Sequence, residues 1–306
     1  MSPFQFSWPL GYTPCHKVGR TTSYGKITAM DMDTHTLVDH YHQHLVTALL
    51  ARVAATDTVH RELFGFEIVR QGTATAVLAK HWPRPLDGVP FNRVYNYTAR
   101  DASPTDPLLA YVGDAAVDAV VEVGAGPHET AAAARLHRAG WTPRWQIPWL
   151  HVPLAQVTAA PPTAVHVRPV LPSEMEQFAT VLVHGYGYTG MQATYWHTFA
   201  QYGYTAPGFH CFVAEVNATP IGAGVLHIAG TTALVDGAAT LPPYRGRGAQ
   251  TALFVARMHH AREHGCAYAV SRTGRGSVSH HNMEKLGLTV VTHSTAWRAG
   301  SMLPVT

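Results

Sequence analysis

The sequence predicts an α/β (α+β) protein of two domains, each a mixed, mainly antiparallel sheet flanked by helices. Three observations lead to this prediction. Apolar runs of strand length alternate with segments of helical periodicity along most of the chain. The short, proline-marked segment Thr158–Thr163 divides the 306 residues into two halves of ordinary domain size. Both halves also repeat one order, in residues 120–141 and 269–288: strand, glycine break, helix, and a glycine before the next strand.

The first half is expected to begin with an irregular segment, which is followed by helices and strands. Residues 1–33 are rich in turn formers, whereas Leu37, Tyr41 and Leu45 follow at helical spacing. The predicted helices are Asp33–Ala55, Pro107–Ala119 and His128–Arg138, and the predicted strands are Phe64–Arg70, Thr73–Ala79, Phe91–Tyr97, Ala119–Val123 and Trp141–Leu154.

The second half is expected to hold a three-stranded antiparallel meander between helices. Ser173 and Glu176 have the spacing of a capping box, and Asn217–Pro220 suits a hairpin turn. Gly265 is positioned to end a helix. The predicted helices are Ser173–His184, Gln192–Tyr202, Ala249–His264 and Ser277–Leu286, and the predicted strands are Val165–Arg168, Phe209–Val216, Ile221–Ile228, Ala233–Leu241, Ala267–Arg272 and Leu288–Trp297.

Composition limits the classes of function. The chain is 46% hydrophobic and 13% charged, so it can bury sizeable cores. A net charge of +3 is too small to indicate nucleic-acid binding. Cys15, Cys211 and Cys266 are few and odd in number, which favours a reducing cytoplasm over a disulfide framework. With no secretory signal and no transmembrane run, we expect a cytoplasmic monomer or homodimer without nucleic-acid or membrane partners.

A basic glycine loop lies between the last strand of the meander and the helix that follows it. It reads Arg245-Gly246-Arg247-Gly248-Ala249-Gln250. Free N–H groups at the start of a helix, with two arginines beside them, suit a phosphate or pyrophosphate. Neither a nucleotide-hydrolysing P-loop nor the dinucleotide fingerprint occurs here.

This loop and its flanking elements resemble the GNAT superfamily of N-acetyltransferases, in which motif A holds the pyrophosphate of coenzyme A. The order of elements over nearly all of residues 164–298 is similar to that of the family fold. The run Ser279–Leu288 is similar to the sequence that family members carry at their last helix. Gln250 stands where the family usually has Gly or Ala. The resemblance implies two tandem GNAT-like domains: residues 1–160, degenerate, and residues 164–306, catalytic.

The first half lacks a comparable loop. Aligning Gly140 with Gly287 places its equivalent near Thr98–Pro104, which contains no glycine. We therefore expect one cofactor per chain, bound by the second half.

The resemblance implies acetyl-CoA as co-substrate, with the strand before the loop offering backbone groups to the thioester arm. Ala239, Thr240 and Leu241 are the candidates for this, and Asn282 is a further candidate for the cofactor arm. Arg275 could meet a cofactor phosphate or be a solvated loop residue.

The chemistry expected is direct attack by an amine, after a base removes its proton. Asp236, inside an apolar strand, is the candidate base; the alternative is a structural carboxylate, and Glu215 is a weaker candidate expected to face solvent. The family's usual acid, a tyrosine on the last helix, is replaced by Met283. Tyr186, Tyr188 and Ser279 could substitute, although the two tyrosines are favoured as walls of the acceptor pocket.

The histidines predict no metal site. His40, His42 and His44 do not share one helical face, and no cysteine or carboxylate completes a ligand set. The pairs His259-His260 and His280-His281 are expected to be exposed on helices.

The predicted function is acetyl-CoA-dependent N-acetylation of a small metabolite amine, with a natural product or antibiotic among the candidate acceptors. Two alternatives stay open at this point. One is a tandem GNAT-like transferase that takes its donor from aminoacyl-tRNA. The other is a non-catalytic protein that keeps the fold to sequester a small molecule.

Overall fold

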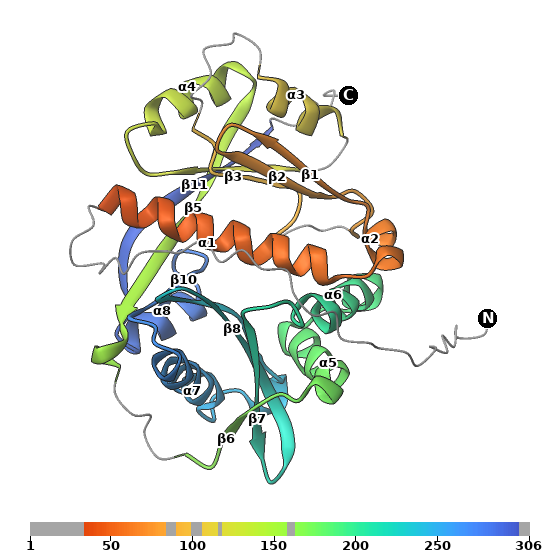
Figure 1. Ribbon diagram of the computed structural model, residues 1–306, viewed down its shortest axis with the longest axis vertical. Coiled ribbons are helices and arrows are strands. Elements are labelled where there is room, and N and C mark those ends of the chain that lie inside the picture. The colour runs from red at the N-terminus through yellow and green to blue at the C-terminus, as the bar shows by residue number, and fades with distance from the viewer. Residues whose placement is uncertain (1–33, 84–89, 99–105, 116–117, 158–162, 300–306) are drawn as a thin grey trace.

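The structure, a computed structural model, describes residues 34–83, 90–98, 106–115, 118–157 and 163–299 (Figure 1). The predicted irregular residues 1–33, with Cys15, lie outside the described part, as do most of the linker and of the first-half segment 98–104. The helices are α1 (Thr34–Ala55), α2 (Thr58–Phe64), α3 (Pro107–Asp114), α4 (Glu129–Arg138), α5 (Met175–Tyr186), α6 (Gly190–Gly203), α7 (Ala249–Glu263) and α8 (Val278–Lys285). The strands are β1 (Phe66–Gln71), β2 (Ala74–Ala79), β3 (Arg93–Tyr95), β4 (Val120–Gly124), β5 (Trp141–Pro153), β6 (His166–Pro169), β7 (Phe209–Val216), β8 (Thr219–Ala229), β9 (Thr232–Thr240), β10 (Tyr268–Arg272) and β11 (Thr289–Ala299).

All eleven described strands form one continuous sheet, in the order β1-β2-β3-β4-β11-β5-β10-β9-β8-β7-β6. Two neighbouring pairs are parallel, β3 with β4 and β9 with β10, and they stand at matching positions of the two halves. The other pairs are antiparallel. The predicted mixed, mainly antiparallel α/β class is therefore confirmed.

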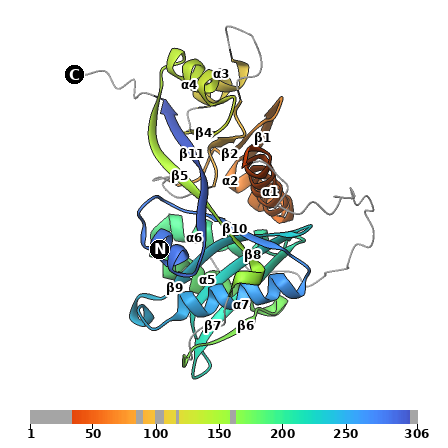
Figure 2. The ribbon, with the colours of Figure 1, turned by 90° about the vertical axis from the view of Figure 1, so that its left-hand side faces the viewer.

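The two halves exchange their last strands. β5, from the first half, pairs with β10 of the second, while β11, from the second half, pairs with both β5 and β4. Figure 2 shows β5 and β11 as long strands that run from one half into the other. The sequence predicted a sheet in each half, and the exchange joins them into one.

Helices cover both faces of the sheet in the second half. Gly222 and Gly224 of β8 face α7, since a Cβ at either would contact Leu253. Ala223, between them, belongs instead to the core that α5 and α6 build. Side chains alternate along a strand, so the two helical layers lie on opposite faces.

Helix α1 of the first half lies across the sheet of the second half. Its Tyr41 and Ala48 share a buried cluster with Leu234 of β9 and Val270 of β10. Further along α1, Leu49 and Val53 pack in a second cluster with Phe199 of α6. This packing brings the C-terminal end of α1 to the edge of the site described below.

Three details differ from the sequence prediction. Helix α2 was missed: residues 58–63 were assigned to no element and Phe64 to a strand. Asp57 caps this helix and Gly65 ends it in the left-handed region. The predicted Ser173 capping box is wrong: the Glu174 carboxylate, 2.9 Å away, accepts from the Leu171 N–H instead. Strand β3 is much shorter than predicted. Within the described residues, no helix is long and apolar enough to cross a membrane.

Candidate active site

The site begins where β9 and β10 diverge. β10 pairs with β9 only at Thr232, Ala233 and Leu234. Beyond these pairs, the Ser271 hydroxyl donates to the Val235 carbonyl at 2.9 Å. β9 nevertheless continues its pairing with β8 as far as Thr240. The backbone of β9 beyond Val235 is thus open on one side, along a cleft of about 1250 Å³.

The predicted glycine loop forms one end of this cleft. Gly248 is the N-cap of α7, with φ of +84°, a conformation that side-chain-bearing residues rarely adopt. Among the described residues, no side chain caps the helix, and its first residues, Gly248, Ala249 and Gln250, line the cleft. The N–H groups of this first turn therefore lack a side-chain acceptor from the described part of the chain. The Gln250 amide donates to the Thr240 hydroxyl at 3.1 Å, which ties the helix start to β9.

The two loop arginines differ in what they contact. Arg245 donates to the carbonyls of Gly185, at 2.9 Å, and Thr240, at 3.3 Å. It therefore fastens the end of β9 to the end of α5. Arg247 stands over the Tyr244 ring, 5.4 Å from its centre, and does not line the cleft.

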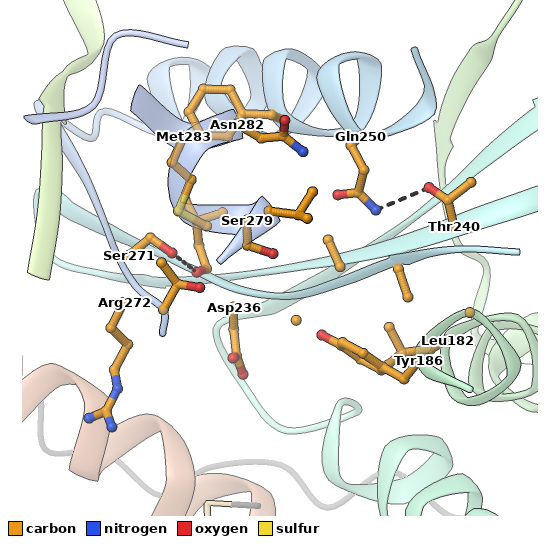
Figure 3. Close-up of a pocket in the computed structure, with 18 of the residues that line it drawn as sticks. Leu182, Tyr186, Asp236, Thr240, Gln250, Ser271, Arg272, Ser279, Asn282 and Met283 are labelled. Carbon is orange, nitrogen blue, oxygen red and sulfur yellow. Dashed lines mark hydrogen bonds between the residues drawn. The ribbon is translucent and has the colours of Figure 1, made fainter. Parts of the chain in front are cut away.

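Helix α8 supplies the opposite wall near the loop. Ser279, Asn282 and Met283 all line the cleft. Figure 3 shows Gln250, Asn282 and Met283 on one side of the central strands, with Asp236 and Tyr186 on the other. The cleft therefore has two ends, a helix-lined end at the loop and a second end at Asp236.

A β-bulge sets the direction of Asp236. Gly224 pairs with Ala238 and Val225 with Asp236, so Gly237 is the extra residue in β9. A Cβ at Gly237 would lie 3.2 Å from the Tyr186 hydroxyl, so this position has no room for a larger residue without movement.

Buried Arg257 of α7 holds the bulge from the face of the sheet that α7 covers. Its guanidinium donates to the carbonyls of Val225, at 2.9 Å, and Asp236, at 3.0 Å. Burial lowers the pKa of Arg257 to about 10. The sequence reasoning missed this residue, although a lone arginine among the apolar residues of a helix was a usable signal.

Asp236 also faces a cation from the other half. Arg52 of α1 places Nη1 at 3.4 Å from the carboxylate, and its guanidinium lies over the rings of Tyr204 and Phe199. Arg52 is 4% exposed and the Asp236 side chain 34%. The carboxylate thus remains open to the cleft while the arginine is enclosed. Sequence reasoning missed Arg52 too, since nothing local connects it with β9.

The two predicted tyrosines stand at the Asp236 end. Tyr186 leaves 47% of its surface open because it lines the cleft, whereas burial around its hydroxyl, together with the Asp236 charge, raises its pKa. Tyr188 stacks on Trp196 of α6, with ring centres 5.6 Å apart, and burial raises its pKa. Both tyrosines therefore have raised pKa values, and their rings form part of an aromatic wall of the cleft.

A buried ionic cluster joins the halves below this end. Glu122 of β4, fully buried, accepts from Arg93 of β3 and from Arg272 of β10, the latter at 2.8 and 2.5 Å. Burial alone would raise the pKa of Glu122, but the two arginines hold it at about 2. Arg93 and Arg272 also line the cleft, so the cluster forms part of its floor.

Several predicted residues lie away from the chemistry. Glu215 was expected in solvent but is buried and bound to Arg168 at 2.9 Å. His280 was expected to be exposed but is buried, with Nδ1 accepting from the Gly276 N–H. Arg275 donates to Gln146 at 2.6 Å.

The three histidines of α1 have different partners. His40 bonds to Thr232, His42 to Asn96 and Ser294, and His44 to His227. They therefore do not converge on one point.

The matching position in the first half is built differently. The N-terminus of α3 is capped by the Asp106 carboxylate, which accepts from the N–H groups of Leu108 and Leu109. The Tyr97 hydroxyl, at 2.6 Å, and Arg135 also contact this carboxylate. The Asp106 carboxylate thus occupies the N-terminus of α3, whereas the described residues provide no such cap at the N-terminus of α7.

Comparison with known proteins agrees with this geometry. Residues 175–288 match the model of the acetyltransferase (GNAT) family. A search of curated proteins finds no match.

Solved structures with this fold span both halves. A GCN5-related N-acetyltransferase from Kribbella flavida has a TM-score of 0.57 at 14% identity, covering 87% of this chain and 97% of its own. A tandem GNAT protein from the clavulanic acid biosynthesis pathway has a TM-score of 0.54 at 16% identity, covering 86% and 96%. A third, a GCN5-related N-acetyltransferase from Sphaerobacter thermophilus, has a TM-score of 0.52 at 15% identity, covering 85% and 93%. At these identities the likeness shows the fold alone, a GNAT fold with a tandem protein among its neighbours.

Proposed function

We propose, because residues 175–288 match the model of the acetyltransferase (GNAT) family, that this protein transfers an acetyl group from acetyl-CoA to the amine of a small molecule. One observation carries the proposal. The diverging strands β9 and β10 connect an uncapped helix N-terminus, at one end of a single cleft, with an open carboxylate at the other.

The proposed cofactor end is the loop Arg245–Gln250. The N–H groups at Gly248, Ala249 and Gln250, which no side chain of the described residues caps, suit the pyrophosphate, and the loop arginines add positive potential. Arg245 contributes mainly by holding the loop to β9 and α5, as its hydrogen bonds indicate. Asn282, which lines the cleft from α8, is proposed to contact the cofactor arm.

The proposed place of the thioester arm is the open edge of β9. The Leu241 N–H already donates to Ile221 and its carbonyl accepts from Tyr244, which removes Leu241 from the original three candidates. Alternate residues of a strand bond to the same neighbour, so Ala239 pairs with β8 as Leu241 does. The Thr240 carbonyl already accepts from Arg245, and the Ala238 backbone is hydrogen-bonded to the Tyr186 hydroxyl. The Thr240 N–H is then the backbone group proposed to face the arm.

The proposed reaction is a direct transfer. The amine nitrogen attacks the thioester carbonyl, the new C–N bond forms, and the C–S bond breaks to release the thiolate. Asp236 takes the proton that the nitrogen loses, directly or through one water. Met283 cannot protonate the thiolate, so that proton comes from solvent or from Ser279 or Tyr186 at the cleft wall.

The proposed acceptor pocket lies between the halves. Tyr186, Tyr188 and Trp196 offer apolar aromatic surface, and Leu45 and Leu49 of α1 close the other side. This combination favours a small amine with an apolar or aromatic body, placed with its nitrogen toward Asp236.

The test is release of free thiol from acetyl-CoA in the presence of a panel of small amines. Asp236→Asn should lower kcat by about 100-fold or more while leaving the affinity for CoA unchanged. Gly248→Trp should abolish CoA binding in calorimetry. Gly72→Trp, at a left-handed glycine in the β1–β2 turn, imposes the same backbone strain far from the cleft and should bind CoA normally.

The outcomes separate the rival functions. CoA binding without thiol release for any amine would overturn the transferase proposal and favour a sequestering protein. Thermal stabilisation by aminoacyl-tRNA and not by acetyl-CoA would favour the tRNA-dependent alternative.

A further inference from the structure

Three histidines gather on the far side of the second half, away from the cleft. His210 lies on β7, and His260 and His264 lie one turn apart at the C-terminal end of α7. One ring nitrogen from each lies within 4.8 Å of the other two, and His260 Nε2 is 3.0 Å from His210 Nδ1. The ring centres of His260 and His264 are 4.1 Å apart.

We propose that His210, His260 and His264 form a binding site for one divalent transition metal of the zinc class. Three imidazoles with a water as fourth ligand is a common tetrahedral set for Zn²⁺. With Zn–N bonds of about 2.0–2.1 Å, the ligand nitrogens stand roughly 3.4 Å apart, so small ring rotations suffice.

The hydrogen bonds already orient one of the ligands. His264 Nδ1 is 2.8 Å from the His260 carbonyl oxygen, which can only accept, so the proton is on Nδ1. The lone pair of His264 is then on Nε2. A backbone carbonyl that fixes the tautomer in this way is the usual support of a metal-bound histidine.

The remaining pair shares one proton between His210 Nδ1 and His260 Nε2. A metal placed between them would take the lone pairs of both nitrogens, and the proton would pass, by exchange with solvent, to the other nitrogen of its own ring, so that both imidazoles stay neutral. His264 is exposed while His210 and His260 are half-buried, so an ion can reach the site from solvent.

A metal bound at this site would have a structural role and would take no part in the acetyl transfer. It joins β7 to the end of α7, while the proposed pyrophosphate site is at the start of α7. Eleven residues separate His260 from Ala249, which corresponds to roughly 16 Å along the helix. The inference therefore does not depend on the proposed function, and each can fail alone.

The experiment uses the full chain without an affinity tag, stripped of metal with EDTA. Zn²⁺ is titrated by calorimetry, and Co²⁺ is followed by visible absorption, which is intense for tetrahedral sites. We expect one tight equivalent per chain and a rise in Tm with Zn²⁺. His264→Ala, at the exposed ligand, and His260→Ala should each weaken binding by at least about tenfold. His259→Ala, the adjacent residue on the same helix, is the matched control and should bind as the wild type does.

Each outcome decides the proposal. Loss of the tight equivalent in both ligand variants, with Tm unchanged in EDTA for His264→Ala, supports the site. Absence of a tight equivalent, or binding equal in wild type, His260→Ala and His264→Ala, overturns it.

Discussion

Replacing Glu122 with Gln tests whether the ionic cluster at the floor of the cleft holds the two halves together. The carboxylate is fully buried and bound by Arg93 of its own half and Arg272 of the other. The Gln side chain keeps the size but removes the charge, so the guanidinium groups of Arg93, which is buried, and Arg272, which is half-buried, lose a counterion. Removing one partner of a buried pair typically costs about 3–5 kcal/mol.

The pKa gives a second estimate of the same quantity. The pKa of Glu122 is about 2 instead of the ordinary 4.5. At 1.36 kcal/mol per pKa unit, this corresponds to roughly 3 kcal/mol of folding free energy at neutral pH. Because the folded pKa is the lower one, this stability is fully present above pH 4.5 and is lost as the pH falls toward 2.

The assay is urea unfolding of wild type and Glu122→Gln at several pH values. We expect the variant to be less stable by roughly 3 kcal/mol at pH 7 and by roughly 2 kcal/mol at pH 3.5. Glu67→Gln, in the surface pair of Glu67 with Lys80, is the control and should change stability little. A loss below about 1 kcal/mol at pH 7, or a gap that does not narrow in acid, would refute the reasoning.

Two further predictions concern the proposed transfer. Calorimetric titration of the intact chain with CoA should give one site, because Asp106 already occupies the α3 N-terminus, and Gly248→Trp should remove it; a second equivalent would contradict the reading of the first half. Replacing Cys15, Cys211 and Cys266 together with alanine should preserve turnover, since burial raises the pKa of Cys211 to about 12 and of Cys266 to about 11 and so disfavours a nucleophilic thiolate. An acetylated cysteine in intact-protein mass spectra would show that the transfer is not direct.

Local sequence signals were sufficient for most of the second half. The hairpin β7–β8, the glycine loop and α7 lie where their turn residues and periodicity placed them, because each depends on neighbours a few residues away. The same holds for the glycine at the start of α7, whose φ of +84° only glycine adopts readily.

Contacts between residues far apart in the chain could not be predicted from the sequence, for a physical reason. Arg52 meets Asp236 across 184 residues, and Glu122 meets Arg272 across 150. Neither pair leaves a local pattern, because burial and strand order bring the residues together. The exchange of β5 and β11 escaped in the same way, since a strand's sequence shows that it is buried and not which neighbour it pairs with.

The exchanged strands have a consequence for how the chain is made. When β5 emerges from the ribosome, β10 and β11, its partners on both edges, have not been synthesised. β11 follows roughly 140 residues later, which takes about 7–28 s at ordinary rates of translation. During that time the thirteen-residue strand β5 has two unpaired edges, the feature that most readily recruits other chains. We expect the nascent first half to remain partly folded and dependent on chaperones until β11 of the second half is synthesised and pairs with β4 and β5.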